Sequence, residues 1–485
     1  MIEIKEVSFS YDGQNGGGLH GVNLSVKDGE CVLLCGRSGC GKTTITRLVN
    51  GLIPHFYPGH LEGSVLVDGK DIGDLSMYRI SSRVGSVFQN PRTQFFNVDT
   101  DSEIAFGIEN EAYPAAELAR RVEQTTEELG IQDLRGRNIF QLSGGEKQKV
   151  AFASVYAMNP DIYLLDEPSS NLDMAAIQEL RKHLGMIKKQ GKTILIAEHR
   201  LYYLMDLVDR IVYLDQGRIC DIYTLSEFRS LSGSKRQQMG LRAIDLKEEM
   251  PAGVTGAVNA APVLKLQDVS FFYKKRTILE NISLTASPGE VIGVVGHNGA
   301  GKTTFSRALC GLHKNCGGEF FWNGKRQSFK QRLRLSYMVM QDVNYELFAE
   351  SVEAECFFGI KNPDMPLVAL TMENLGLTNI RDRHPNTLSG GQKQRVAAAV
   401  SMICRKELLI FDEPTSGLDY DSMAQAAGLI CSLARTGKII FIVTHDFEFV
   451  CRTCSRVLHF DEGEMPDDIA VKPNSLDELR ALFSV

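Results

Sequence analysis

Two similar stretches decide the fold: CGRSGCGKTT at residues 35–44 and VGHNGAGKTT at residues 295–304. Each contains the pattern G-x-x-x-x-G-K-[ST], follows a short apolar run and leads into a helix-compatible segment. In that context the pattern predicts a phosphate-binding loop, because glycines let backbone N–H groups curl around phosphate oxygens at a helix N-terminus. The alternative is a glycine turn that only caps a helix. We expect two nucleotide sites.

The predicted loops supply three kinds of contact to a nucleotide: backbone amides, a lysine charge and a threonine hydroxyl suited to Mg2+. The ATP-contacting residues expected in the first loop are Gly36, Arg37, Ser38, Gly39, Cys40, Gly41, Lys42, Thr43 and Thr44. Those expected in the second loop are Gly296, His297, Asn298, Gly299, Ala300, Gly301, Lys302, Thr303 and Thr304.

The rest of the chain repeats in the same way. LSGGEKQKVA at 142–151 recurs as LSGGQKQRVA at 388–397, and LLDEPSSNLD at 164–173 recurs as IFDEPTSGLD at 410–419. The interval from Glu167 to His199 is 32 positions, as is that from Glu413 to His445. The repeat predicts two copies of one domain at 1–229 and 263–485, joined by a linker at 230–262 with little periodicity.

Composition narrows the class of protein. The 485 residues carry a net charge of -7, which argues against a nucleic-acid binder held by a broad cationic face. No run of about 18 uncharged apolar residues occurs, and the start alternates like a strand rather than a signal peptide, so we expect a membrane role only through a partner. The 11 cysteines are scattered; for the pair Cys451 and Cys454, helix packing is favoured over a metal or redox role.

Within each copy, short apolar runs alternate with amphipathic stretches. This order predicts an α/β fold with a mostly parallel sheet covered by helices, preceded by an antiparallel part in which Tyr11 or Tyr273 lies near a turn. The first copy carries extra residues in or near LIPHFYPGHLEG, which we expect to be a surface insertion.

Acidic pairs follow two of the predicted buried strands. Asp166 and Asp412 end these strands, where an unpaired carboxylate is costly, so a hydrated metal ion is the expected partner. Glu167 and Glu413 come next and are placed to polarise an attacking water. The alternative is a pair of acids satisfied by solvent.

The LSGG stretches allow two interpretations. Ser143 with Glu146, and Ser389 with Gln392, fit a capping box that begins a helix. Capping alone does not require two internal glycines, which weaken a helix by about 1 kcal/mol each relative to alanine. Bare glycine backbone at a helix start favours a second anion contact, so phosphate binding is also expected from these residues. The residues concerned are Ser143, Gly144, Gly145, Ser389, Gly390 and Gly391.

With these motifs in this order, twice, the chain resembles the ATPase subunits of ATP-binding-cassette (ABC) transporters. The resemblance implies two P-loop ATPase domains, each with a helical subdomain, that hydrolyse ATP with Mg2+ and pair head to tail. It implies that residues 143–145 face the nucleotide of Lys302, that 389–391 face that of Lys42, and that Asp173 and Asp419 lie at the seam.

The resemblance also implies roles for single residues. Gln89 and Gln341 would reach Mg2+ and the attacking water, beside the metal-binding Thr43, Asp166, Thr303 and Asp412. His199 and His445 would contact the terminal phosphate and hold Glu167 or Glu413 in place. Tyr11 and Tyr273 look like the aromatics that stack on adenine, although an ordinary half-buried strand tyrosine is an alternative.

Within the family, GLIPHFYPGHLEGSVLVDG, FQNPRTQFF and IAEHRL resemble energy-coupling-factor (ECF) transporter ATPases, which import vitamins or metal ions. This implies a peripheral protein on the cytoplasmic face of the membrane, with a coupling transmembrane protein and a substrate-binding membrane subunit as partners. Carboxylates expected to meet arginines of that partner are Asp101, Glu103, Glu353 and Glu355, with a solvated acidic helix start as the alternative. Rival hypotheses are a monosaccharide-importer ATPase, in which the LSGG stretch, the signature of the family, usually has Asn after the glycines, and a soluble tandem protein acting on ribosomes.

Overall fold

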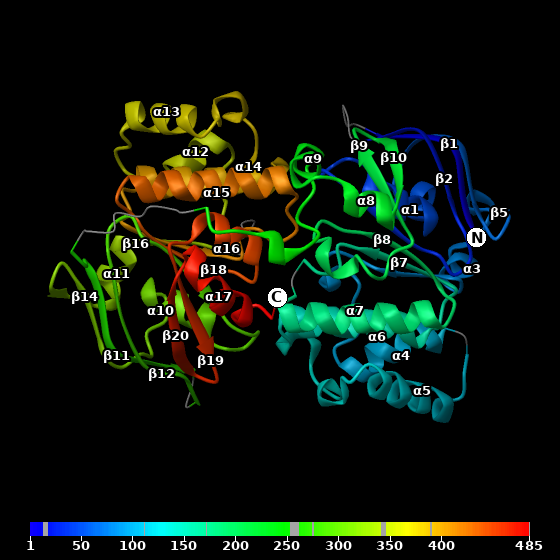
Figure 1. Cartoon of the computed structure of the whole chain (residues 1–485), viewed down its shortest axis with the longest axis horizontal. Helices are drawn as coiled ribbons and strands as arrows, with labels where there is room; N and C mark the ends of the chain where they lie inside the picture. Colours follow the sequence, from blue (N-terminus) through cyan, green and yellow to red (C-terminus); the bar gives the residue numbers. More distant parts are fainter. Residues whose placement is uncertain are drawn as a thin grey trace. The chain divides into compact units, whose positions relative to one another are not determined.

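The computed structural model describes residues 1–12, 18–110, 112–170, 172–252, 261–273, 276–340, 346–388 and 390–484. Two predicted site residues, Gln341 and Ser389, lie outside these ranges, and the side chain of Tyr273 is likewise not described. The chain divides into two compact units, residues 1–245 with 417–421, and residues 246–416 with 422–485 (Figure 1).

The larger sheet of the first unit has six strands in the order β10-β9-β3-β8-β7-β6. All neighbours run parallel except β10. Every residue of β3, β7 and β8 is buried, which explains why these strands read as continuous apolar runs. Their bounds are β3 (Cys31–Gly36), β6 (Val84–Val87), β7 (Ile162–Asp166), β8 (Thr193–Ala197), β9 (Arg210–Asp215) and β10 (Arg218–Thr224).

A smaller antiparallel sheet packs against the same core. Its order is β2 (Leu19–Val26), β1 (Ile2–Tyr11), β4 (Gly59–Val67) and β5 (Lys70–Asp71). The predicted insertion supplies the start of β4, which pairs with β1 as far as Tyr11 and Gly59. The insertion therefore lengthens β4 to nine residues, whereas the counterpart of β4 in the second copy, β14 (Glu319–Trp322), has only four.

Helices complete the first unit. Three of them, α4, α5 and α6, contact one another and form the helical part visible beside α7 in Figure 1. Helix α6 also packs on β6. The helices are α1 (Lys42–Val49), α2 (Leu52–His55), α3 (Met77–Ser81), α4 (Thr100–Glu109), α5 (Ala115–Glu128), α6 (Gly144–Ala157), α7 (Met174–Lys189), α8 (Leu225–Ser230) and α9 (Gly233–Gln238).

The second unit repeats this plan. Its larger sheet has the order β16-β17-β18-β13-β19-β20 and its smaller sheet the order β12-β11-β14-β15, each matching the first unit strand for strand. The strands are β11 (Leu264–Tyr273), β12 (Arg276–Ala286), β13 (Val291–Val295), β15 (Lys325–Arg326), β16 (Ser336–Val339), β17 (Leu408–Asp412), β18 (Ile439–Val443), β19 (Arg456–Asp461) and β20 (Glu464–Ala470). The helices are α10 (Lys302–Leu309), α11 (Phe329–Leu335), α12 (Val352–Cys356), α13 (Met365–Asn374), α14 (Gly390–Ile403), α15 (Tyr420–Arg435), α16 (Phe447–Thr453) and α17 (Leu476–Leu482).

The expected fold class is thereby confirmed for both copies, with two differences in detail. Helix α12 has five residues where α4 has ten, so the copies diverge after the loop that begins at Gln89 in the first copy, which we call the glutamine loop. The segment expected to be an aperiodic linker contains α9, and Arg236, Met239 and Leu241 are buried. The first part of that segment is therefore packed structure, and residues 253–260 lie outside the described ranges.

Candidate functional site

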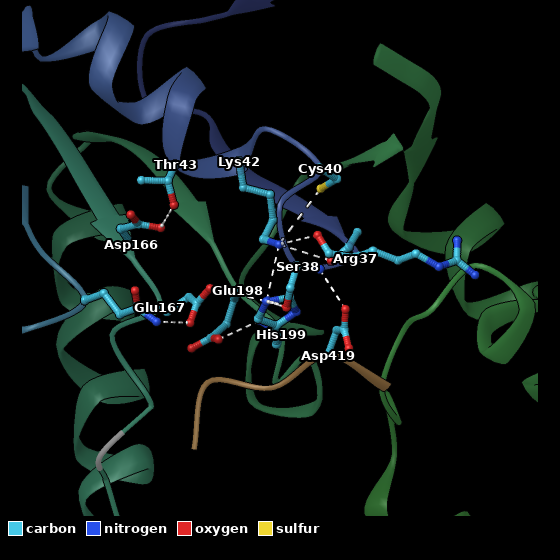
Figure 2. Close-up of polar contacts among 12 residues, drawn as sticks. Arg37, Ser38, Cys40, Lys42, Thr43, Asp166, Glu167, Glu198, His199 and Asp419 are labelled. Carbon is cyan, nitrogen blue, oxygen red and sulfur yellow. Dashed lines mark hydrogen bonds and ion pairs between the residues drawn. The ribbon is translucent and has the colours of Figure 1, made fainter. Parts of the chain in front are cut away.

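The first phosphate loop joins β3 to α1, as the motif predicts. Gly36 and Gly41 have φ angles of 145° and 109°, a region that favours glycine, and a Cβ on Gly36 would lie 2.1 Å from the Leu214 carbonyl oxygen. The Lys42 ammonium donates to the carbonyl oxygens of Gly36 and Arg37, at 3.1 Å each. The loop thus encloses the lysine that is expected to meet phosphate (Figure 2).

The metal-binding pair predicted from the sequence comes together at the end of β7. Thr43 Oγ1 donates to Asp166 Oδ1 at 3.1 Å. Burial, and then the neighbouring Glu167 charge, raises the pKa of Asp166 to about 6. A buried carboxylate facing a hydroxyl is an oxygen donor set that fits Mg2+, whose charge would compensate the cost of keeping Asp166 ionised.

Glu167 occupies a strained backbone position directly after β7. Its φ is 47°, and that of Glu413 in the second copy is 49°. A left-handed conformation at a residue other than glycine costs on the order of 1–3 kcal/mol and is concentrated at functional sites. Glu167 Oε2 accepts a hydrogen bond from Gln89 Nε2 at 2.6 Å. The Glu167 carboxylate thus contacts Gln89, the first residue of the glutamine loop.

His199 follows β8 and meets residues from three other elements. Its Nε2 lies 3.2 Å from Glu167 Oε1, 3.3 Å from Lys42 Nζ and 3.5 Å from Ser38 Oγ. Because the central strands are parallel, their carboxyl ends share one edge of the sheet, which brings these side chains together. Figure 2 shows the cluster.

The second copy repeats these contacts where it is described. Lys302 Nζ donates to the carbonyl oxygens of Gly296 and His297 at 2.8 and 2.9 Å, and Thr303 Oγ1 donates to Asp412 Oδ2 at 3.5 Å. Burial raises the pKa of Asp412 above its usual value. His445 Nε2 lies 3.4 Å from Glu413 Oε1. The role expected for Gln341 falls outside the described residues.

The signature residues of the first copy form the capping box expected for a helix start. Ser143 N donates to Glu146 Oε2 at 2.8 Å, and Glu146 N donates to Ser143 Oγ at 3.3 Å. Gly144 and Gly145 are the first two residues of α6. Capping is therefore present, and the phosphate contact of this segment stays a prediction.

Tyr11 lies beside the phosphate loop. Its hydroxyl is 3.1 Å from Thr44 Oγ1 and accepts from Arg47 Nη1 at 3.1 Å, while its ring meets Phe9 and Tyr57 edge-on. The structure places this aromatic next to α1, and its stacking on adenine remains a prediction. For Tyr273 only the backbone is described, at the end of β11.

The structure adds contacts that the motif alone did not predict. The first unit includes Gly417–Asp421, and Asp419 Oδ2 accepts from Ser38 N at 2.7 Å. The Arg37 guanidinium points away from Lys42 (Figure 2). Its Nε donates to Asp421 Oδ2 at 2.7 Å and its Nη2 to the Gln238 carbonyl oxygen at 2.6 Å. Within the phosphate loop, Arg37 therefore contacts Lys42 only through its backbone carbonyl, while its guanidinium is paired with Asp421 and the Gln238 carbonyl oxygen.

The expectation that four acids await a partner's arginines is wrong for two of them. Glu103 is 2% exposed and accepts from Phe96 N and Asn97 N, and Glu355, 4% exposed, accepts from Phe348 N and Ala349 N. Both carboxylates accept hydrogen bonds from the backbone of the turn that precedes their helix, so they are not available to a partner. Asp101 and Glu353 are paired within their own copies, with Arg135 and Arg381 respectively.

The structure bears on two interpretations made from the sequence, one about the pair Cys451 and Cys454 and one about membrane-spanning segments. Cys451 and Cys454 are buried, and burial raises the pKa of each thiol to about 12, as expected for cysteines that pack a helix. In the described part of the chain there is no group of three or more metal-ligating His, Cys, Asp or Glu residues. None of the described helices is both long and apolar enough to cross a bilayer.

Known proteins similar to this chain are ATP-binding proteins of one family. The family model described as "ABC transporter" matches residues 19–170 and 279–416. Two proteins of Treponema denticola, each provisionally named an ABC transporter ATP-binding protein, are 47% and 38% identical to the chain; they match 98% and 100% of it and 99% of their own lengths.

A solved structure has a similar fold over nearly the whole length of this chain. An archaeal ribosome recycling factor, in complex with a ribosomal stalk protein, superposes with a TM-score of 0.66 over 98% of this chain and 92% of its own. At 22% identity this likeness shows the fold alone. Taken with the repeated sites and the relatives above, the chain belongs to the ABC transporter family and is an ATP-binding protein with two tandem ABC ATPase domains.

Proposed function

We propose that both copies hydrolyse ATP with Mg2+ and that the chain energises a membrane importer of the ECF type, for a vitamin or a metal ion. The observation that carries the ATPase roles is the Glu–His pair, 3.2 Å apart in one copy and 3.4 Å in the other. A single degenerate copy would lack one of these pairs, whereas here each accompanies a phosphate-loop lysine and a buried aspartate.

In the proposed reaction Glu167 and Glu413 polarise the attacking water, and His199 and His445 hold those carboxylates and contact the terminal phosphate. Lys42 and Lys302 neutralise phosphate charge. Mg2+ would be held by Thr43, Asp166 and Gln89 in one copy and by Thr303, Asp412 and Gln341 in the other, and would neutralise charge on the phosphates. The signature residues 143–145 and 389–391 would complete head-to-tail ATP sites.

The transport assignment is supported by an apolar groove in the first copy. The groove has a volume of about 220 Å³ and is lined by Leu52, Met77, Phe88, Phe96, Phe106 and Met158, among others. Its walls include residues of the predicted insertion and of the glutamine loop, two stretches that resemble ECF ATPases, together with residues of α3, β6, α4 and α6. A helix from a coupling transmembrane protein fits such a groove, because an apolar helix face buries apolar surface there.

The rival functions remain less well supported. The tandem protein acting on ribosomes shares the fold, but the named relatives at 47% and 38% identity are ABC transporter ATP-binding proteins. For the monosaccharide importer, Glu146 and Gln392 stand where Asn is usual. We therefore place the chain at the cytoplasmic face of the membrane, bound to membrane subunits.

Co-purification from native membranes tests the transport proposal. Recovery of an integral-membrane protein together with a small substrate-binding membrane subunit is the expected result. Recovery of ribosomes without membrane protein would overturn it in favour of the ribosomal role. Mg2+-dependent phosphate release by the purified chain tests the ATPase roles separately, since it needs no membrane partner.

A further inference from the structure

Glu198, the residue before His199, is a buried carboxylate that accepts hydrogen bonds from two loops. It is 2% exposed. Its Oε1 accepts from Ser169 N at 3.2 Å and from Tyr203 Oη at 2.9 Å. Its Oε2 accepts from the backbone amides of His199 and Arg200, at 2.7 and 3.3 Å. A buried carboxylate with four donors is held firmly, because the loss of any one leaves a polar group unpaired.

Arg200 strengthens the same connection from the other side. Its side chain is buried, and Nη1 donates to the carbonyl oxygens of Ser169 and Leu172, at 3.3 Å each. Ser169 and Leu172 follow Glu167 in the chain and precede Asp173, which caps α7. The loop that carries His199 is thus tied to the segment that leads from the catalytic glutamate to Asp173.

The second copy makes an equivalent tie with different residues. Thr444 stands at the position of Glu198, and the acid is one residue beyond the histidine, at Asp446. Thr415, the counterpart of Ser169, donates from Oγ1 to Asp446 Oδ2 at 2.8 Å, and both residues are buried. Because the two copies reach the same link with unrelated side chains, the link itself is the shared feature.

We propose that Glu198 is a positioning residue that couples the Ser169–Leu172 segment to His199. A displacement of that segment is transmitted through Glu198 to the His199 backbone, and it changes the distance between His199 and Glu167. The segment ends at Asp173, which the family resemblance predicts to lie at the seam of the head-to-tail ATP sites of the proposed function, so Glu198 would link that seam to the first ATP site. This inference rests on the proposed function.

The test uses the full chain with Glu413→Gln, which confines turnover to the first site. Adding Glu198→Gln converts one acceptor oxygen into an NH2 group that faces at least one backbone N–H donor, whichever way the amide is turned. We expect kcat to fall about tenfold to a hundredfold, as for a displaced catalytic group, with the KM for ATP and the binding of a fluorescent ATP analogue unchanged within about twofold. Tyr203→Phe removes a single donor and provides a milder variant with the same direction of effect.

The decisive readout is a double-mutant cycle with His199→Ala. If Glu198 acts through His199, Glu198→Gln adds no further loss once His199 is gone, because the two losses are not independent. Additive losses, or unchanged kcat in both Glu198→Gln and Tyr203→Phe, would overturn the inference. Glu30→Gln is the matched control: Glu30 pairs with Arg210 away from these loops, and its loss is expected to lower stability but not kcat. A parent chain without ATPase activity would instead contradict the proposed function.

Discussion

Glu167 Oε1 lies 3.2 Å from His199 Nε2, and the corresponding atoms of Glu413 and His445 are 3.4 Å apart. Both glutamates have a positive φ, and both follow a strand whose last residue is a buried or half-buried aspartate. The strained backbone is therefore reproduced in both copies together with the contact. This repetition argues for two working ATP sites.

Replacing both glutamates by glutamine should separate ATP binding from ATP turnover. Glutamine preserves size but does not polarise water as a carboxylate does, so we expect Glu167→Gln with Glu413→Gln to lower turnover by about 10²- to 10⁴-fold. Equilibrium ATP binding should persist, because the lysines and loop amides are untouched. Phosphate release and nucleotide retention measure the two quantities; full hydrolysis by the double variant would contradict the role of these residues.

Mg2+-dependent ATP binding should weaken as pH falls through about 6, the value to which burial raises the pKa of Asp166. Below that pH a proton occupies the carboxylate that Mg2+ requires, so apparent Mg2+ affinity at the first site should drop by up to about tenfold per pH unit. Titrations of Mg2+ at pH 5, 6 and 7, in a chain with Lys302→Ala, measure this. Asp166→Asn should bind Mg2+ weakly at every pH; an unchanged pH slope in that variant would assign the proton to another group.

The sequence predicted which side chains the structure brings together at the end of the sheet, but not the contacts that hold them. Motif spacing located Lys42, Asp166 and His199, because parallel strands bring their carboxyl ends to one edge. It could not reveal the buried hydrogen bonds of Glu198 or Glu103, since an acid beside a strand or in a first helical turn is expected to be solvated. Their backbone donors come from loops whose approach depends on the tertiary fold.

Glu346→Gln should stabilise the protein at neutral pH. Burial raises the pKa of Glu346 to about 7, while its Oε1 accepts from Met340 N at 2.6 Å. The folded state thus binds a proton that the unfolded state releases above its ordinary glutamate pKa, so stability is lost as pH rises from about 4.5 to 7. Glutamine keeps the acceptor without the charge, and the first copy has Gln94 at this position, accepting from Phe88 N. We expect a gain of about 1–3 kcal/mol at pH 7.5.

Chemical denaturation of Glu346→Gln and the parent at two pH values provides the comparison. At pH 4 the parent carboxyl is protonated in the folded state and mostly protonated in the unfolded state, so the two proteins should differ little. Gln94→Glu is the reciprocal variant and should destabilise the first copy as pH rises. A gain for Glu346→Gln that is equal at pH 4 and pH 7.5 would show that charge is not its cause.

Phe96 should matter for the membrane partner and not for ATP. Its ring is 75% exposed, stacks on Phe106 with ring centroids 4.9 Å apart, and lines the proposed docking groove. Burial of such a ring contributes about 1.5–3 kcal/mol, so Phe96→Ala should weaken association with the coupling transmembrane protein by roughly tenfold to a hundredfold. Basal ATPase activity of the isolated chain should be unchanged, because Phe96 contacts none of the ATP-site residues described above.

The chain offers two comparisons for this variant. Phe348, 69% exposed, is the counterpart of Phe96 in the second copy, whose shorter helix α12 changes the surface around it. Phe348→Ala therefore asks whether the second copy binds the partner as strongly. Ile222→Ala removes an exposed apolar side chain from β10, outside the groove, and should leave association intact. Retention of the partner by Phe96→Ala and Phe348→Ala together would contradict the proposed docking surface, because both exposed rings would then be dispensable for assembly.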